Sequence, residues 1–271
     1  MAVILEGGCR VSEMREGVPV EHGALRIWNQ IGRATGAQAI SLRVLEFAPG
    51  LSPGIRNDEC DEILYVLDSS WQSESADCVA VSTTCVSGWA NLLINGRSYE
   101  TGGDAGIYLR PGETFAVDNP ALNSIILISS RCPDPDRSPE FVPPPTNVSD
   151  SIPTARSPIV RLADQAAQPT GNRWYRVLID DEVGSTQVTQ FVGSIPPGRA
   201  PDHFHNYEEV LFILKGKGRM WAGDTKTPIG AGSCIYLPRG QVHCVENTGD
   251  DELRLLGLFY PAGSPSVRYD V

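Results

Sequence analysis

The chain has 271 residues, of which 41% are hydrophobic and 20% are charged, so it can bury one large core or two medium ones. Its formal net charge is −11, and residues 1–150 hold ten Arg, no Lys and twenty Asp or Glu. Binding to a nucleic-acid backbone needs clustered cations, so this composition excludes nucleic acid as an expected partner.

The N-terminal segment reads MAVILEGGCR and contains only a four-residue apolar run with no basic stretch before it. This pattern predicts neither a signal peptide nor a membrane span, and we expect a cytoplasmic protein with no membrane partner. Seven cysteines without C-x-x-C spacing predict reduced thiols rather than a disulfide scaffold or a thiolate zinc site.

Two segments of the chain repeat. Residues 61–67 (DEILYVL) match 208–214 (EEVLFIL), and residues 106–113 (GIYLRPGE) match 234–241 (CIYLPRGQ). Both copies consist of short β-branched and aromatic runs separated by turn dipeptides such as Asn95-Gly96, without long helical periodicity. The chain is therefore predicted to be a duplicated, all-β protein of two barrels or sandwiches.

A proline-rich stretch from residue 132 to 153 lies between the copies and predicts an extended linker. We place the domain boundary near residue 150, which gives domains 1–150 and 151–271, with a short helix possible at Leu162–Gln168. The first copy has 19 extra residues, and we expect the polar stretch 68–85 to be a surface insertion that serves as a lid or a dimer contact.

Three of the four histidines fall in two short motifs of the second copy. His203 and His205 are two residues apart, so on a strand both rings point to the same face. Glu209 begins the next predicted strand after a turn, and His243 follows a tight turn at residues 238–240. We interpret the fourth histidine, His22, as an ordinary core or surface residue.

This set of side chains suits a metal ion. Three neutral imidazoles and one carboxylate favour Mn, Fe, Co, Ni, Cu or Zn over Ca or Mg. Four protein ligands on an octahedral ion leave two positions for water, dioxygen or a bidentate anionic substrate. Catalysis is the favoured interpretation, and metal binding without catalysis stays an alternative.

The two motifs resemble those of the cupin superfamily, Gly-x5-His-x-His-x3-Glu-x6-Gly and Gly-x5-Pro-x-Gly-x2-His-x3-Asn. The second is matched at every position, whereas the leading glycine of the first, Gly198, is one residue out of step. The resemblance covers roughly residues 40–130 and 175–260. It implies a bicupin, with two double-stranded β-helix (jelly-roll) barrels in tandem, and a homodimer.

The first copy departs from this pattern, because its ligand positions hold Arg56, Asp58, Glu62 and Phe115. An arginine at the would-be metal point would repel a cation and could pair with a neighbouring carboxylate. We therefore expect no transition metal in the N-terminal barrel. A scaffold or dimerisation role is favoured there over a second ligand pocket.

Three further residues are candidates for catalysis. Tyr236 and Gln241 could donate a proton or orient a substrate, and Arg219 could hold a substrate carboxylate, unless the strand register turns them outward. The expected function is a metal-dependent enzyme for a small anionic or oxygen-chelating metabolite, with dioxygenase-type chemistry first because the ligand set resembles that of quercetin dioxygenases. The alternatives are a Lewis-acid isomerase, lyase or hydrolase, and a non-catalytic protein that binds a small acid or sugar.

Overall fold

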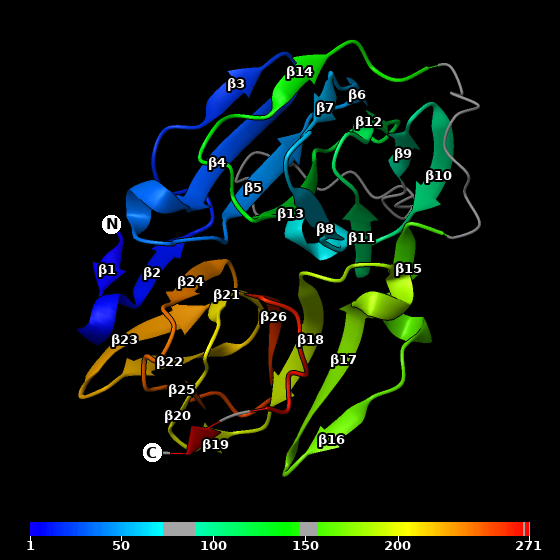
Figure 1. The fold of residues 1–271 in the computed structure, drawn as a ribbon. Coiled ribbons are helices and arrows are strands. Elements are labelled where there is room, and N and C mark those ends of the chain that lie inside the picture. The colour runs from blue at the N-terminus through cyan, green and yellow to red at the C-terminus, as the bar shows by residue number, and fades with distance from the viewer. Residues whose placement is uncertain (73–89, 147–156, 268, 271) are drawn as a thin grey trace.

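The computed structural model describes residues 1–72, 90–146, 157–267 and 269–270. These residues form two barrels, one above the other in Figure 1. Within the described part of the chain, the helical elements are short 3-10 turns: η1 (Glu6–Gly8), η2 (Arg33–Thr35), η3 (Ser69–Gln72), η4 (Leu162–Asp164) and η5 (Asp181–Val183). The expected all-β fold with tandem jelly-roll barrels is confirmed.

The N-terminal barrel consists of two antiparallel sheets. The larger sheet contains, in spatial order, β15 (Ile159–Arg161), β11 (Ala105–Leu109), β8 (Asp61–Val66), β13 (Ile125–Cys132), β5 (Leu42–Phe47), β4 (Leu25–Ile31) and β3 (Val20–His22). The smaller sheet contains β10 (Arg97–Thr101), β9 (Ala90–Ile94), β12 (Thr114–Asn119), β7 (Gly54–Arg56) and β14 (Glu140–Val142), and β6 (Gly50–Leu51) also pairs with β12.

The C-terminal barrel repeats this plan. Its larger sheet contains β1 (Val3–Ile4), β2 (Arg10–Glu13), β24 (Ser233–Leu237), β21 (Glu208–Lys215), β26 (Leu253–Tyr260), β18 (Thr189–Ile195), β17 (Arg173–Ile179) and β16 (Gln168–Thr170). The smaller sheet contains β23 (Thr225–Gly230), β22 (Lys217–Ala222), β25 (His243–Asn247), β20 (His203–Phe204) and β27 (Tyr269–Asp270), and β19 (Gly198–Arg199) also pairs with β25.

The two barrels exchange strands. Near the start of the chain, β2 pairs with β24 of the C-terminal barrel, where Val11 lies opposite Ile235. In return, β15 from the second half pairs with β11 of the N-terminal barrel, where Ile159 lies opposite Ile107. Figure 1 shows both exchanges, the dark blue strands beside β24 and the yellow-green β15 beside β11. The boundary near residue 150 lies outside the described residues and stays a prediction.

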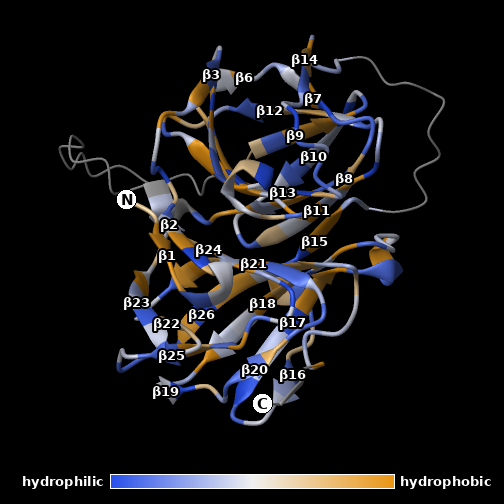
Figure 2. Ribbon diagram, turned by 60° about the vertical axis from the view of Figure 1, so that its left-hand side comes forward, coloured by the Kyte–Doolittle hydropathy of each residue, from blue (hydrophilic) through white to orange (hydrophobic). Residues whose placement is uncertain are grey.

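Side-chain alternation along the central strands produces three apolar clusters. On β21, Leu211 and Ile213 point into the C-terminal barrel, whereas Val210 and Phe212 point the other way, into the cluster that joins the two barrels. A third cluster fills the N-terminal barrel. Figure 2 shows hydrophobic residues along the strands of both barrels, including β24 near the boundary between them. The larger sheets are therefore apolar on both faces.

Two sequence expectations differ from the fold. The short helix at Leu162–Gln168 is a single 3-10 turn, η4, because Gln168 already pairs with Tyr175 in a strand and proline follows it. The proline-rich stretch contributes the strand β14 at the edge of a sheet, between Pro139 and Pro143. Most of the expected insertion, residues 73–85, lies outside the described residues. No described helix is long and apolar enough to cross a membrane.

Candidate metal centre

Three histidines meet at the mouth of the C-terminal barrel. His203 lies on β20 and is directly opposite His243, the first residue of β25. His205 follows β20 by one residue, so the period of two brings its ring to the same side as His203. His205 and His243 are 7% and 4% exposed. The sheet register, together with the His-x-His spacing, therefore gathers side chains that are 40 residues apart in the sequence.

The imidazole groups are close enough to share one ion. One ring nitrogen from each histidine lies within 4.8 Å of the others, and the ring centroids are 4.5 Å apart for His203 and His243 and 4.9 Å apart for His203 and His205. This is the only such group of His, Cys, Asp or Glu donors that the described residues contain. Nitrogen donors in a largely buried cluster fit a divalent transition metal.

Backbone carbonyls orient two of these rings. The Pro201 carbonyl accepts a hydrogen bond from His203 Nδ1 at 2.9 Å, and the Gln241 carbonyl accepts one from His243 Nδ1 at 2.8 Å. In a neutral ring, each bond places the proton on Nδ1 and the lone pair on Nε2. Both rings are thus prepared to offer Nε2 to a metal ion.

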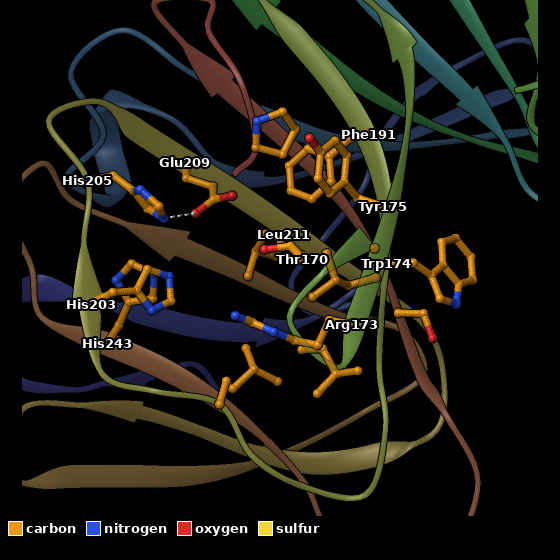
Figure 3. A pocket seen from close by; sticks show the side chains of 17 residues that line it. Thr170, Arg173, Trp174, Tyr175, Phe191, His203, His205, Glu209, Leu211 and His243 are labelled. Carbon is orange, nitrogen blue, oxygen red and sulfur yellow. Dashed lines mark ion pairs between the residues drawn. The ribbon is translucent and has the colours of Figure 1, made fainter. Parts of the chain in front are cut away.

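Glu209, the first inward-pointing residue of β21, lies beside the triad. Its Oε2 is 3.7 Å from His205 Nε2, and its side chain is 7% exposed. Figure 3 shows the carboxylate turned toward His205. Burial raises the pKa of Glu209 to about 8. A cation at the triad would offset this effect, because an opposite charge favours the ionised carboxylate.

Two of the histidines, His205 and His243, are neutral near pH 7. Burial, followed by the charge of His203, lowers the pKa of His205 to about 4. The same causes lower the pKa of His243 to about 3. Neutral imidazole is the form that ligates a metal, so these two ligands need no deprotonation at physiological pH.

The triad opens into a cavity of about 100 Å³. Its far wall is apolar and aromatic and includes Trp174, Tyr175 and Phe191, while Arg173 and Thr170 add polar groups. Figure 3 shows the histidines on one side of the pocket, the aromatic rings on the other, and the Arg173 side chain extending from the aromatic side toward the histidines. The pocket thus combines nitrogen donors, one cationic group and an apolar wall.

The three candidate catalytic residues lie elsewhere. The Tyr236 hydroxyl donates to Glu208, and its ring belongs to the cluster between the barrels, because the register pairs it with the outward-pointing Val210. Arg219 is on the outer face, 3.3 Å from Glu246. The Gln241 amide donates to the Val242 carbonyl, and the side chain packs against Gly7 of η1. None of the three lines the pocket of the triad.

Two residues at the site escaped the sequence analysis. Tyr207 is stacked between His205 and Phe259, with ring centroids 4.6 Å and 4.3 Å away. Tyr207 comes two residues after His205, and this spacing was the sequence feature that could have placed the two rings on the same side. Arg173 lies on β17, far from either motif, and carries no sequence signal beyond its place near aromatic residues.

The equivalent positions of the N-terminal barrel hold a different arrangement. Arg56 Nε lies 2.6 Å from Asp58 Oδ1, Glu62 is paired with buried Arg43, and Phe115 is 1% exposed. These positions thus hold a phenyl ring and two carboxylates that are already in ion pairs with arginines, which is not a donor set comparable to the histidine triad. A metal-free N-terminal barrel stays a prediction.

Comparison with known proteins agrees with this picture of the C-terminal half. The family profile for the cupin domain matches residues 191–259. Auxin-binding protein 1 of Arabidopsis thaliana is 34% identical over 27% of this chain and 42% of its own length. The oxalate-binding protein of Thermotoga maritima is 35% identical over 24% of this chain and 54% of its own length. The chain thus covers about half the length of these two relatives.

Solved structures resemble the whole chain. A Bacillus subtilis oxalate decarboxylase, described with Mn(II) centres, has a TM-score of 0.69 at 16% identity, over 94% of this chain and 78% of that one. A putative glyoxylate-induced protein from Pseudomonas aeruginosa has a TM-score of 0.70 at 16% identity, over 96% and 91%. At these identities the likeness concerns the fold.

Proposed function

Because this chain belongs to the cupin superfamily and is a bicupin, we propose that its C-terminal barrel binds one divalent transition-metal ion and uses it to transform a small anionic metabolite. The proposed ligands are His203, His205, Glu209 and His243. The observation that carries the proposal is the histidine triad, in which backbone carbonyls orient two rings through Nδ1. The candidate metals are Fe, Mn, Ni, Cu, Co and Zn.

A bound ion of this kind supplies a Lewis acid and an attachment point for dioxygen or a chelating oxygen pair. The protein supplies the rest of the site. Arg173 can pair with a carboxylate of the metabolite, since its guanidinium offers a planar pair of donors. The aromatic wall holds an apolar body and excludes water, which strengthens that ion pair.

The reaction we propose first is dioxygenase-type cleavage, supported by the resemblance of the ligand set to that of cupin dioxygenases. An oxygen-independent lyase, isomerase or hydrolase is the second candidate. It is supported by Arg173 at the pocket and by the fold shared with oxalate decarboxylase. The likeness to oxalate-binding and auxin-binding proteins supports a third, a non-catalytic carrier of a small acid.

Metal analysis tests the shared premise. Protein purified without an affinity tag or added metal is expected to contain about one equivalent of a transition metal per chain, and His203→Ala and His243→Ala are expected to lose it. His22→Ala is the matched control, because its ring stacks on Phe141 in the other barrel. Metal content unchanged by the triad variants would refute the site. Oxygen uptake with substrate then separates the first reaction from the second.

We also propose a cytoplasmic homodimer. Reduced thiols support the compartment, because the five described cysteines are buried and unpaired. Sheet-edge strands such as β10 and β23 support association, since among the described residues their backbone groups on one side have no strand partner. Light scattering on the purified protein measures the oligomeric state.

A further inference from the structure

The N-terminal barrel contains a cavity of its own. It has a volume of about 250 Å³ and lies between β3, β4 and β5 on one side and residues 131–141 on the other. Four arginines and two aspartates line it, and Glu62 and Glu59 pair with two of these arginines, Arg43 and Arg137. The cavity therefore offers an anion several guanidinium groups, of which Arg33 forms no ion pair with the described residues.

The strand register shows which residues of the C-terminal barrel are equivalent to two of these arginines. In the C-terminal barrel, Phe259 lies opposite Glu209; in the N-terminal barrel, Arg131 lies opposite the equivalent Glu62. In the same way, Phe191 is opposite Gly257, whereas Arg43 is opposite Ser129. Two guanidinium groups thus take the positions of two phenyl rings beside the former metal-ligand position. Two arginines therefore lie beside Glu62, the residue equivalent to the proposed ligand Glu209.

These two arginines are buried and incompletely satisfied. Arg43 is 1% exposed, and its Nη2 donates to Glu62 at 2.5 Å and to Ser129 Oγ at 2.8 Å. Arg131 Nη2 lies 2.9 Å from Asp134. The Nε atom of each arginine has no hydrogen-bond partner among the described residues. Burial lowers the pKa of Arg43 to about 10, so its guanidinium remains charged at pH 7.

At the rim, Arg33 is exposed and forms no ion pair with the described residues. Arg137 lies 2.9 Å from Glu59, and both are more than half exposed. The rim thus provides a cationic group, Arg33, that can reach an incoming anion. A guanidinium matches the planar oxygen pair of a carboxylate.

Apolar side chains line the rest of the cavity wall. They are Val20, Ile27, Ile31 and Phe141, and the ring of Phe141 is stacked on His22 with centroids 4.2 Å apart. Inorganic phosphate would leave this wall in contact with water, whereas an organic group would cover it. We propose that the N-terminal barrel is a second, metal-independent binding site for a small organic carboxylate, held by its arginines and this apolar wall.

Calorimetric titration of the metal-loaded, full-length protein tests the site with three probes: benzoate, benzamide and inorganic phosphate. Benzoate is expected to bind saturably. Benzamide should bind at least about tenfold more weakly, because it lacks the charge and a hydrogen bond to a charged group contributes about one power of ten or more. Phosphate should also bind at least about tenfold more weakly, because it has no apolar body to cover the apolar side chains of the cavity. Benzamide binding as tightly as benzoate would overturn the role of the arginines. Phosphate binding more tightly than benzoate would overturn the organic ligand class.

Variants locate the binding. Arg33→Gln removes a positive charge from the cavity and Asn29→Asp adds a negative one, and neither changes a buried ion pair. Each variant is expected to weaken the binding of benzoate about tenfold. Arg97→Gln on β10, outside the cavity, is the matched control and should bind normally. Benzoate affinity that is unchanged by both cavity variants, or is lost instead in Arg173→Gln or His203→Ala, overturns this second site and leaves the proposed metal centre untouched.

Discussion

Replacing Glu62 by glutamine tests whether the N-terminal barrel depends on its buried ion pair. The side chains of Glu62 and Arg43 are each 2% exposed, so water cannot solvate the guanidinium once its partner loses its charge. Ser129 and Asn57 also donate to the Glu62 carboxylate, and these bonds would have to rearrange. Removing one partner of such a pair costs about 3–5 kcal/mol.

Urea denaturation followed by tryptophan fluorescence measures this cost. With a slope of about 2–3 kcal/mol per molar urea, the loss corresponds to a fall in the midpoint of about 1–2.5 M. Glu59→Gln is the matched control, because Glu59 and Arg137 form an exposed ion pair. An exposed pair contributes about 0–1 kcal/mol, so the control should shift the midpoint only slightly.

A second variant separates charge from packing. Arg43→Leu combined with Glu62→Leu removes both charges and keeps an apolar filling, and it should recover most of the stability that Glu62→Gln loses. The reasoning is refuted if Glu62→Gln is no less stable than Glu59→Gln. It is also refuted if the double variant is less stable than Glu62→Gln alone, since the pair would then stabilise the barrel outright.

Two predictions concern the metal centre. Burial raises the pKa of Glu209 to about 8, so below that pH a metal ion must displace its proton. Apparent metal affinity, measured by chelator competition, should rise about tenfold per pH unit from about pH 6 to 8 and then level off. The Glu209→Gln variant should show no such dependence on pH. A wild-type affinity that does not change with pH would contradict the assignment of Glu209 as a ligand. Tyr207→Ala should weaken metal binding about tenfold because it removes the ring stacked on His205, whereas Tyr207→Phe should retain it. Equal losses in the two Tyr207 variants would argue against stacking as the cause.

Side chains alternate between the two faces of a strand, and this alternation made much of the fold predictable from the sequence. The repeated runs at 61–67 and 208–214 predicted two barrels, and both became central strands of the larger sheets. His203 and His205 could be assigned to one face because alternate residues on a strand point the same way. The gathering of His203, His205 and His243 was predicted and is present in the structure.

Strand pairing across the sheets decided what the sequence left open. Tyr236 turns toward the other barrel because the register places it opposite the outward-pointing Val210, and a slip of one residue would have turned it inward. The stacking of Tyr207 and the approach of Arg173 depend on strands distant in sequence, which no local pattern encodes.

The sequence by itself determined the all-β class, the duplication and the histidine set, because each follows from local spacing and residue chemistry. Only the tertiary structure decided the exchange of β2 and β15 between the barrels, and the burial of Arg43 and Arg131 beside Glu62. These features depend on which strands become neighbours. That choice is made by the burial of whole apolar faces rather than by any single motif.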